Sequence, residues 1–285
     1  MSLDSLIERL ADRESVSAVI LAGSIPLGAA TSVSDLDLIV LLESPNSRPL
    51  PSVRTFPEVV FAAEGQAGSM FEARQVVAVL NGIEVDVHFL SAPAVVALAR
   101  RIAGAGVLLT PNEICFMSRI KTGWVVAQNE RFNDIVGRLR RDNSLEIHTA
   151  TTYVTGSLQE LEDAYAALAD NQELALYLGS CSVEKCFTAF LASRGYAYTG
   201  GKWLRLIDRL EPPRSFDSDS FRSLMANGVK LLFPTPGDRE TAEQYLAGVG
   251  CFLRSVRAVI ELDPLFKIAF ALCPQINEPM SPRHE

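Results

Sequence analysis

The stretch that decides the fold runs from Val16 to Ser24 (VSAVILAGS) and is followed by Ser34-Asp35-Leu36-Asp37. Its first seven residues form a short run rich in valine and isoleucine, which predicts a buried strand. The chain must turn at Gly23-Ser24, because glycine and serine punctuate the end of a strand. Successive backbone N–H groups in such a turn form a concave anion site, and the serine hydroxyl adds a donor.

A second strand is expected from Asp35 to Glu43, where leucine, isoleucine and valine follow the acidic residues. Side chains alternate across a strand, so Asp35 and Asp37 project to the same face. Two carboxylates this close repel each other unless a cation lies between them. The pair is therefore a candidate ligand set for a divalent metal ion.

A third acidic residue is expected on a neighbouring strand. Asn81-Gly82 is a strong hairpin signal, and it predicts that Gln75 to Leu80 and Ile83 to Leu90 pair antiparallel. On the second of these strands Glu84, Asp86 and His88 share one face. Asp86 is favoured as the third ligand because it is central in the apolar stretch, and Glu84 stays open as a substitute. His88 is interpreted as an ordinary hydrogen-bonded residue.

These residues form a motif: Gly23-Ser24-Ile25-Pro26-Leu27-Gly28, then Ser34-Asp35-Leu36-Asp37, then a separate Asp86. The pattern resembles the DNA polymerase beta-like nucleotidyltransferase superfamily, over roughly the first third of the chain. Within it the chain is most similar to small-molecule enzymes with a helical C-terminal half, such as the aminoglycoside and lincosamide nucleotidyltransferases.

The expected fold is α+β, with an N-terminal nucleotidyltransferase domain whose mixed sheet is flanked by helices, followed by an all-α helical bundle. A chain of 285 residues exceeds the usual size of a single core, which also favours two domains. Strand signals cease after Leu90, and the boundary is placed so that the domains comprise residues 1–108 and 109–285. The second domain is expected to form the other wall of the active-site cleft.

Helical periodicity dominates outside the strands. An amphipathic helix is expected at residues 3–10, and one or two helices, interrupted near Gly123, at residues 113–141. Leu158, Leu161, Tyr165 and Leu168 form an apolar stripe; residues 175–191 are apolar almost all round; and a long last helix is expected at residues 242–260. Residues 44–57 are expected to form a loop, and the tail from Pro274 is short and polar.

The resemblance implies metal-dependent transfer of a nucleoside monophosphate from a nucleoside triphosphate, ATP being favoured, to a hydroxyl of a small molecule of antibiotic or natural-product type, with release of pyrophosphate. Two Mg²⁺ ions are the implied cofactors. Lys202, after Gly200-Gly201, is a candidate phosphate contact. The implied catalytic and metal-binding residues are Asp35, Asp37 and Asp86, and the implied nucleotide-binding residues are Gly23, Ser24, Ser34 and Lys202.

Composition restricts the partners. A net charge of −8 and a pI near 5.1 argue against a long nucleic acid, because phosphate-backbone binding needs clustered lysine and arginine. The five cysteines include no C-x-x-C pair and no histidine at the spacing of a zinc site. They are interpreted as reduced residues of a cytoplasmic protein. No signal peptide and no bilayer-length apolar stretch is expected, and the protein is expected to be a monomer or homodimer. A protein-directed or RNA-directed transferase, and a non-catalytic nucleotide-binding homologue, remain alternatives.

Overall fold

The computed structural model describes residues 15–31, 34–43, 59–64, 74–104, 109–214 and 216–273. The chain divides into two compact units, Met1–Asn143 and Ser144–Glu285. Three predicted segments lie outside the described residues: the helix at residues 3–10, the loop at residues 44–57 and the tail from Pro274.

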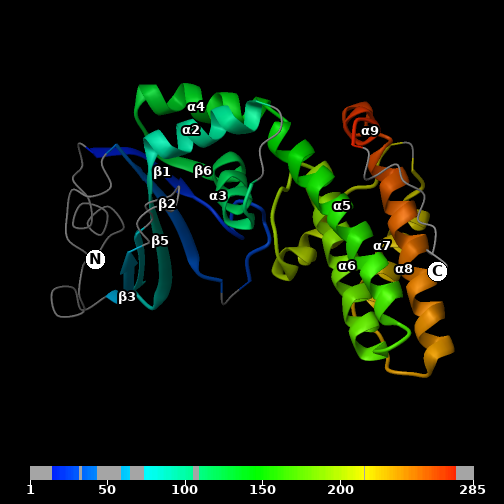
Figure 1. Ribbon diagram of the computed structural model, residues 1–285. Helices are drawn as coiled ribbons and strands as arrows, with labels where there is room; N and C mark the ends of the chain where they lie inside the picture. Colours follow the sequence, from blue (N-terminus) through cyan, green and yellow to red (C-terminus); the bar gives the residue numbers. More distant parts are fainter. Residues whose placement is uncertain are drawn as a thin grey trace. The chain divides into compact units, whose positions relative to one another are not determined.

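The first unit contains a sheet that has six strands among the described residues, in the order β3-β4-β5-β2-β1-β6 (Figure 1). Strands β2 and β5 are parallel, while the other neighbouring pairs are antiparallel, so the sheet is mixed as expected. The strands are β1 Val16–Leu21, β2 Leu36–Leu42, β3 Val59–Glu64, β4 Arg74–Leu80, β5 Ile83–Ser91 and β6 Trp124–Gln128.

The predicted hairpin between β4 and β5 is confirmed. Leu80 pairs with Ile83 across a turn in which Asn81 has φ 53° and Gly82 has φ 80°. Positive φ at both central residues is the type I′ geometry, which matches the twist of the strands and favours Asn-Gly. This turn fixes the register of β5 and thereby the positions of Glu84, Asp86 and His88.

The apolar core on one face of the sheet is formed by alternate side chains of its central strands. Strand β2 is buried from Asp37 to Leu42, as expected for a strand with both faces covered. One face carries a continuous apolar cluster that includes Val19, Leu38, Val40, Val87 and Phe89. The acidic residues of β2 and β5 therefore project to the opposite face.

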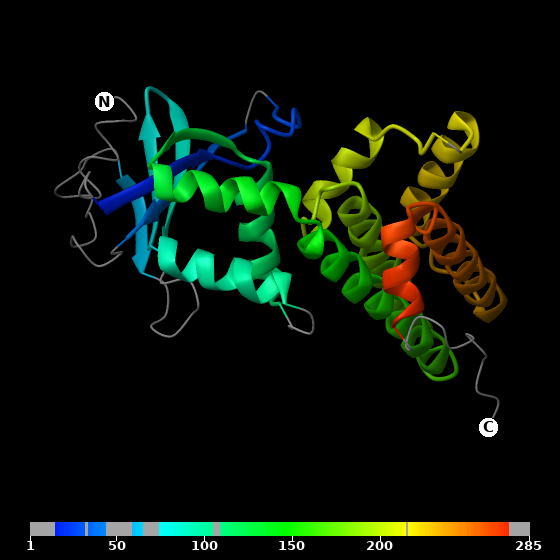
Figure 2. The ribbon, with the colours of Figure 1, turned by 90° about the horizontal axis from the view of Figure 1, so that it is seen from above.

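Three helices gather on one side of the sheet (Figure 2). They are α2 Ala92–Ala103, α3 Pro111–Thr122 and α4 Glu130–Arg141. Helix α3 begins with a capping box, in which Glu113 N donates to Thr110 Oγ1 and Thr110 N donates to Glu113 Oε2. At its other end Arg140 donates to the carbonyl oxygens of Lys121 and Gly123. Both ends of α3 are thus fixed.

The expectation that strands end at Leu90 was wrong. Helix α3 stops at Thr122, and β6 follows and pairs antiparallel with β1, Trp124 lying opposite Leu21. Gly123 allows this close passage, since a Cβ there would lie 2.5 Å from Ile20 Cγ2. The Trp-Val-Val sequence of β6 is β-favouring. Because β6 joins the sheet, the first unit extends to Asn143 rather than to the expected boundary at 108/109.

The second unit is helical. It comprises α5 Ser144–Ala167, α6 Gln172–Ser193, the 3₁₀ helix η2 Gly201–Arg209, α7 Ser218–Leu231, α8 Arg239–Ile260 and α9 Pro264–Ala271. Helix α6 packs against α5 and α8 and buries Phe187 and Phe190 completely. The α+β fold class, with a sheet-containing unit followed by a helical one, is confirmed. Within the stripe predicted on α5, Leu161 and Leu168 are buried, but Tyr165 is exposed.

Helix α6 is, within the described ranges, the one helix whose length and composition would suffice to cross a membrane. The sequence was expected to contain no such stretch. In the structure 61% of its most apolar window is buried inside the protein. The apolar character of α6 is therefore that of a core helix packed by its neighbours.

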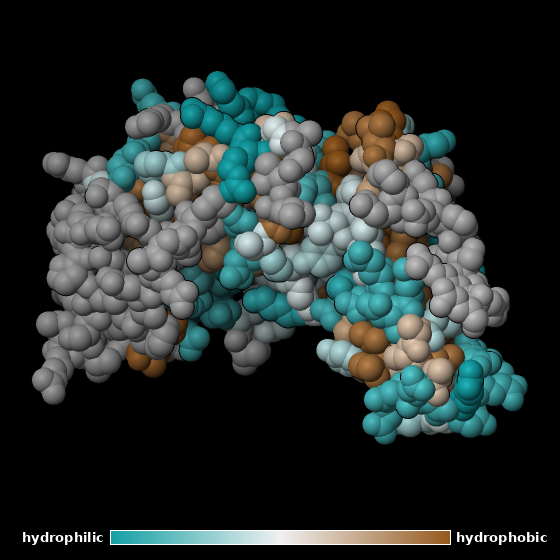
Figure 3. Space-filling model, in the orientation of Figure 1, coloured by the Kyte–Doolittle hydropathy of each residue, from teal (hydrophilic) through white to brown (hydrophobic). Residues whose placement is uncertain are grey.

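Helix α9 buries Phe266 and Phe270 in the second unit. Its other face leaves Leu265, Ile268 and Leu272 exposed, and apolar atoms are visible on the surface there (Figure 3). Helix α8 ends at Ile260, where the sequence predicted its end, and Pro264 opens α9.

Candidate active site

Two of the predicted acidic residues lie side by side on the sheet. In the parallel pair of β2 and β5, Asp37 is the register partner of Asp86. Neighbouring strands are about 4.8 Å apart, and register partners project to the same face. The carboxylates of Asp37 and Asp86 therefore form an adjacent pair at the centre of the sheet.

Asp37 packs directly against the glycine turn. Its side chain is buried, with 8% of the residue exposed, and Ala22 N donates to its main-chain oxygen over 2.9 Å. Gly23 has φ 73°, and a Cβ at that position would lie 1.9 Å from Asp37 Oδ2. Only glycine therefore fits beside this carboxylate.

The turn after β1 is closed by its own hydrogen bonds. Gly28 N donates to Ile25 O over 2.9 Å, and Ala29 N donates to Ser24 O over 2.8 Å. Gly28 adopts φ 64°, which accounts for the later glycine of the motif. The turn places Gly23 and Ser24, both buried, next to the carboxylate pair.

Ser34 has a structural role in the next loop, because Thr31 N donates to Ser34 Oγ over 2.8 Å. Asp35 follows it, half-buried, directly before β2 begins at Leu36. Leu36 pairs with Val85, so Asp35 and the exposed Glu84 each stand one residue before that register pair. These two acids therefore flank the central pair on the side where both strands begin.

Asp86 is held by two neighbours. Gln75 Nε2 donates to both carboxylate oxygens over 3.0 Å, and His88 Nε2 lies 3.2 Å from Oδ2. Burial raises the pKa of Asp86, but the hydrogen bond and charge of His88, the hydrogen bond of Gln75 and the charge of Arg119 outweigh it, so the pKa lies below its usual value. His88 itself packs edge-on against Phe116. Asp86 is accordingly ionised at neutral pH.

Arg119, on α3, is a site residue that sequence reasoning missed. Its Nη1 lies 3.8 Å from Asp37 Oδ1, and only 8% of the residue is exposed. Arg119 lies on roughly the opposite side of the helix from the buried residues Ile114, Met117 and Ile120, so a lone charged residue on that other face gave no signal. The sequence could not show which strand residues that face would meet.

In the part of the chain that the structure describes, no group of three or more His, Cys, Asp or Glu side chains is placed to hold a metal ion. The observed arrangement is the pair Asp37 and Asp86, with Asp35 beside it. The roles of these three residues as metal ligands remain predictions.

Lys202 belongs to the second unit, and its contact with the nucleotide remains a prediction. Its side chain is exposed, with Nζ 5.1 Å from the centre of the Trp203 ring. Trp203 is buried and packs against Tyr198 with ring centres 4.2 Å apart. Lys185, a charged residue of the apolar helix α6, forms an ion pair with Glu160 on α5.

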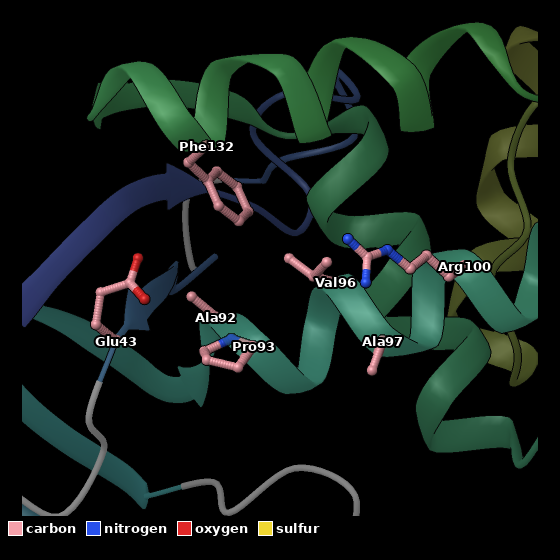
Figure 4. Close-up of a pocket in the computed structure, with 7 residues that line it drawn as sticks. All are labelled: Glu43, Ala92, Pro93, Val96, Ala97, Arg100 and Phe132. Carbon is pink, nitrogen blue, oxygen red and sulfur yellow. The ribbon is translucent and has the colours of Figure 1, made fainter.

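A pocket of about 190 Å³ opens in the first unit, at the other end of β2 (Figure 4). Figure 4 shows Glu43 at one side of it and Arg100 at the other, with Phe132 from α4 above. The lining residues are Glu43, Ala92, Pro93, Val96, Ala97, Arg100 and Phe132. None of the predicted catalytic residues lines this pocket.

A mixed sheet that carries adjacent carboxylates beside a glycine-serine turn is typical of nucleotidyl-transfer enzymes. Residues 3–104 match the nucleotidyltransferase domain family, and this segment contains all the motif residues from Gly23 to Asp86. The chain therefore carries a nucleotidyltransferase domain of the polymerase beta-like superfamily, and it is a nucleotidyltransferase. Arg119 lies outside the matched segment.

Among solved structures, the chain is similar to a nucleotidyltransferase-like protein from Exiguobacterium sibiricum 255-15, whose crystal structure was determined at 1.90 Å resolution. The two share 14% sequence identity with a TM-score of 0.46, over 93% of this chain and 77% of that one. No curated protein matches the sequence.

Proposed function

We propose that the protein transfers a nucleoside monophosphate from a nucleoside triphosphate, with ATP favoured, to a hydroxyl of a small molecule, and releases pyrophosphate with Mg²⁺ as cofactor. One observation supports this proposal above all others. Asp37 and Asp86 are register partners on parallel strands, and Asp37 packs against the Gly23 turn. Such a site sets two carboxylates next to a phosphate-binding backbone.

The residues present fit a hard divalent cation. Carboxylate oxygens are the ligands that Mg²⁺ prefers, and the pair faces a positive charge already, since Arg119 Nη1 lies 3.8 Å from Asp37 Oδ1. Asp37 and Asp86 are the proposed central ligands, with Asp35 completing the set for two ions. When bound, Mg²⁺ would neutralise triphosphate oxygens and lower the pKa of the acceptor hydroxyl.

The chain's own residues would orient the triphosphate. Backbone N–H groups at Gly23 and Ser24, with the Ser24 hydroxyl, would donate to phosphate oxygens, as tight glycine turns do elsewhere. Ser34 and Lys202 are proposed as further nucleotide contacts. Gln75 fixes the orientation of Asp86 through its two hydrogen bonds.

The acceptor hydroxyl must lose a proton during the attack. A carboxylate held ionised by two donors is a weak base, so Asp86 is better suited to be a ligand than a proton acceptor. Glu84 projects from the same face of β5 and is exposed, and we assign the proton transfer to it. The net charge of −8 is compatible with a cationic acceptor of the aminoglycoside type.

The test is a pyrophosphate-release screen with the four nucleoside triphosphates and Mg²⁺, across aminoglycosides, lincosamides and other polyols, with tRNA and protein fractions as further acceptors. Asp37→Asn and Asp86→Asn should each lower the rate about 10²- to 10³-fold, because each removes a carboxylate ligand of the metal ion that would stabilise charge on the reacting phosphate. Glu43→Gln is the matched control, since Glu43 follows the far end of the same strand. Undiminished release by both site variants would refute the proposal, and release only with tRNA or protein would refute the small-molecule acceptor.

A further inference from the structure

We propose that Arg119 is a built-in counter-ion: in the metal-free protein its guanidinium neutralises the Asp37–Asp86 pair, and it gives way when a divalent cation binds there. This inference rests on the proposed function and concerns how the same site is kept stable before substrate arrives. It assigns a positioning role to a residue outside the segment that matches the family.

The burial of Arg119 requires an explanation. Only 8% of the residue is exposed, and its Nε–H has no hydrogen-bond partner among the residues that the structure describes. Arginine is rarely this buried unless it is paired, because a buried charge without compensation is costly. Its guanidinium forms an ion pair with Asp37, and the Phe116 ring centre lies 5.9 Å from the guanidinium carbon. The position of Arg119 is therefore explained by the carboxylate pair.

The guanidinium acts on both carboxylates. It forms an ion pair with Asp37, and its charge is one of the factors that hold the pKa of Asp86 below its usual value. Two adjacent carboxylates oppose each other's ionisation, and a cation beside them removes that penalty. Without Arg119 the metal-free pair would lose this positive charge, and more of the repulsion would remain.

The contact is well suited to being broken. Arg119 Nη1 and Asp37 Oδ1 lie 3.8 Å apart, which is close enough for an ion pair but too far for a hydrogen bond. Moving the Arg119 side chain away from Asp37 therefore breaks no hydrogen bond between these two atoms. The backbone, in contrast, is fixed, because Gly123 N donates to Arg119 O over 2.9 Å and α3 is capped at both ends. The side chain can therefore swing while the helix stays in place.

Competition between Arg119 and a metal ion has a measurable consequence. A divalent cation at the pair would lie within about 5 Å of the guanidinium and be repelled by it. The repulsion between a charge of +1 and a charge of +2 at that distance, in a medium as polar as water, corresponds to about a tenfold change in affinity or more. Removing the arginine charge should therefore tighten metal binding by about that factor. It should also destabilise the metal-free protein.

The experiment measures Mn²⁺ binding to the full-length protein by electron paramagnetic resonance, without nucleotide. Arg119→Met should bind Mn²⁺ about tenfold more tightly than the parent, while Arg119→Lys, which keeps the charge, should bind like the parent. Arg101→Met is the matched control, because Arg101 forms an ion pair with Glu113 at the same 3.8 Å separation. Its affinity for Mn²⁺ should not change.

Thermal unfolding supplies a second readout. In EDTA, Arg119→Met should melt at a lower temperature than the parent, and saturating Mn²⁺ should raise its melting temperature by more than it raises that of the parent. If Arg119→Met does not fold, Arg119→Gln carries the same comparison.

Unchanged or weaker Mn²⁺ binding by the uncharged variants would overturn the inference, as would equal tightening by Arg119→Lys. Asp37→Asn separates this failure from that of the proposed function. If Asp37→Asn weakens Mn²⁺ binding and Arg119→Met leaves it unchanged, only the counter-ion role is wrong. If Mn²⁺ binding does not depend on Asp37, the assignment of the metal site to this residue is wrong, and the counter-ion role of Arg119 is refuted as well.

Discussion

Replacing Gly23 by alanine tests whether the position of the Asp37 carboxylate determines the rate of nucleotidyl transfer. Gly23 has φ 73°, where an L-residue is strained by about 1 to 2 kcal/mol. The new Cβ would also lie 1.9 Å from Asp37 Oδ2, against an ordinary contact of 3.4 Å or more. The carboxylate or the turn must therefore move by about 1.5 Å.

A displacement of this size is large for catalysis. A misplacement of about 1 Å can cost about 10²-fold in rate. Gly23→Ala should accordingly lower kcat about 100-fold or more, while the free energy of unfolding falls by about 1 to 3 kcal/mol, the range expected for a strained backbone position.

Gly82→Ala is the matched control in the same domain. Gly82 has φ 80°, so the backbone strain is similar, but a Cβ there would have no atom of the described residues within 4 Å. The assay compares both variants in urea unfolding and in single-turnover nucleotidyl transfer. Gly82→Ala should lose stability and keep its rate, whereas Gly23→Ala should lose both. If Gly23→Ala transferred nucleotide as fast as Gly82→Ala, the reasoning about Asp37 would be refuted.

Three further predictions concern stability. Thr110→Ala removes the capping box of α3 and should lower the free energy of unfolding by about 1 kcal/mol in urea; a loss near zero would contradict the capping role. Gly228→Ala places a Cβ 2.4 Å from Phe252, so overpacking should destabilise the protein by about 1 to 3 kcal/mol in the same assay, and an unchanged midpoint would show that the bundle adapts freely. Burial lowers the pKa of His148 from 6.5, so the stability contributed by neutral His148 is present above pH 6.5 and lost as the pH falls below it. His148→Gln should therefore flatten the decline of melting temperature between about pH 7 and about pH 5, and an unaltered decline would count against this assignment.

The strands that carry the site were predictable because local sequence determines them. The valine-rich and isoleucine-rich runs, the alternation around Asp37 and the Asn81-Gly82 turn each favour the same structure at short range. The adjacency of Asp37 and Asp86 follows from these strands once β2 and β5 pair in parallel. That pairing joins segments distant in the chain, so local sequence does not determine it.

The features that sequence reasoning missed depend on packing between distant segments. Strand β6 is five residues long and lies between two helices, so helical periodicity on both sides hides it. It is identified by its antiparallel pairing with β1, which joins distant segments of the chain. Arg119 becomes a site residue only because α3 lies over the acidic face of the sheet. The part-buried hydrogen bonds of Gln75 to Asp86 likewise require the register of β4 against β5.

The central claim is that Asp37 and Asp86 together bind the catalytic metal. Anomalous diffraction from crystals containing Mn²⁺ and a non-hydrolysable triphosphate analogue tests it most directly. The account predicts an anomalous peak within about 2.5 Å of an oxygen from each of these two carboxylates, the range of metal–oxygen bonds. Peaks only at other positions, in crystals of protein that is active in solution with Mn²⁺, would contradict it.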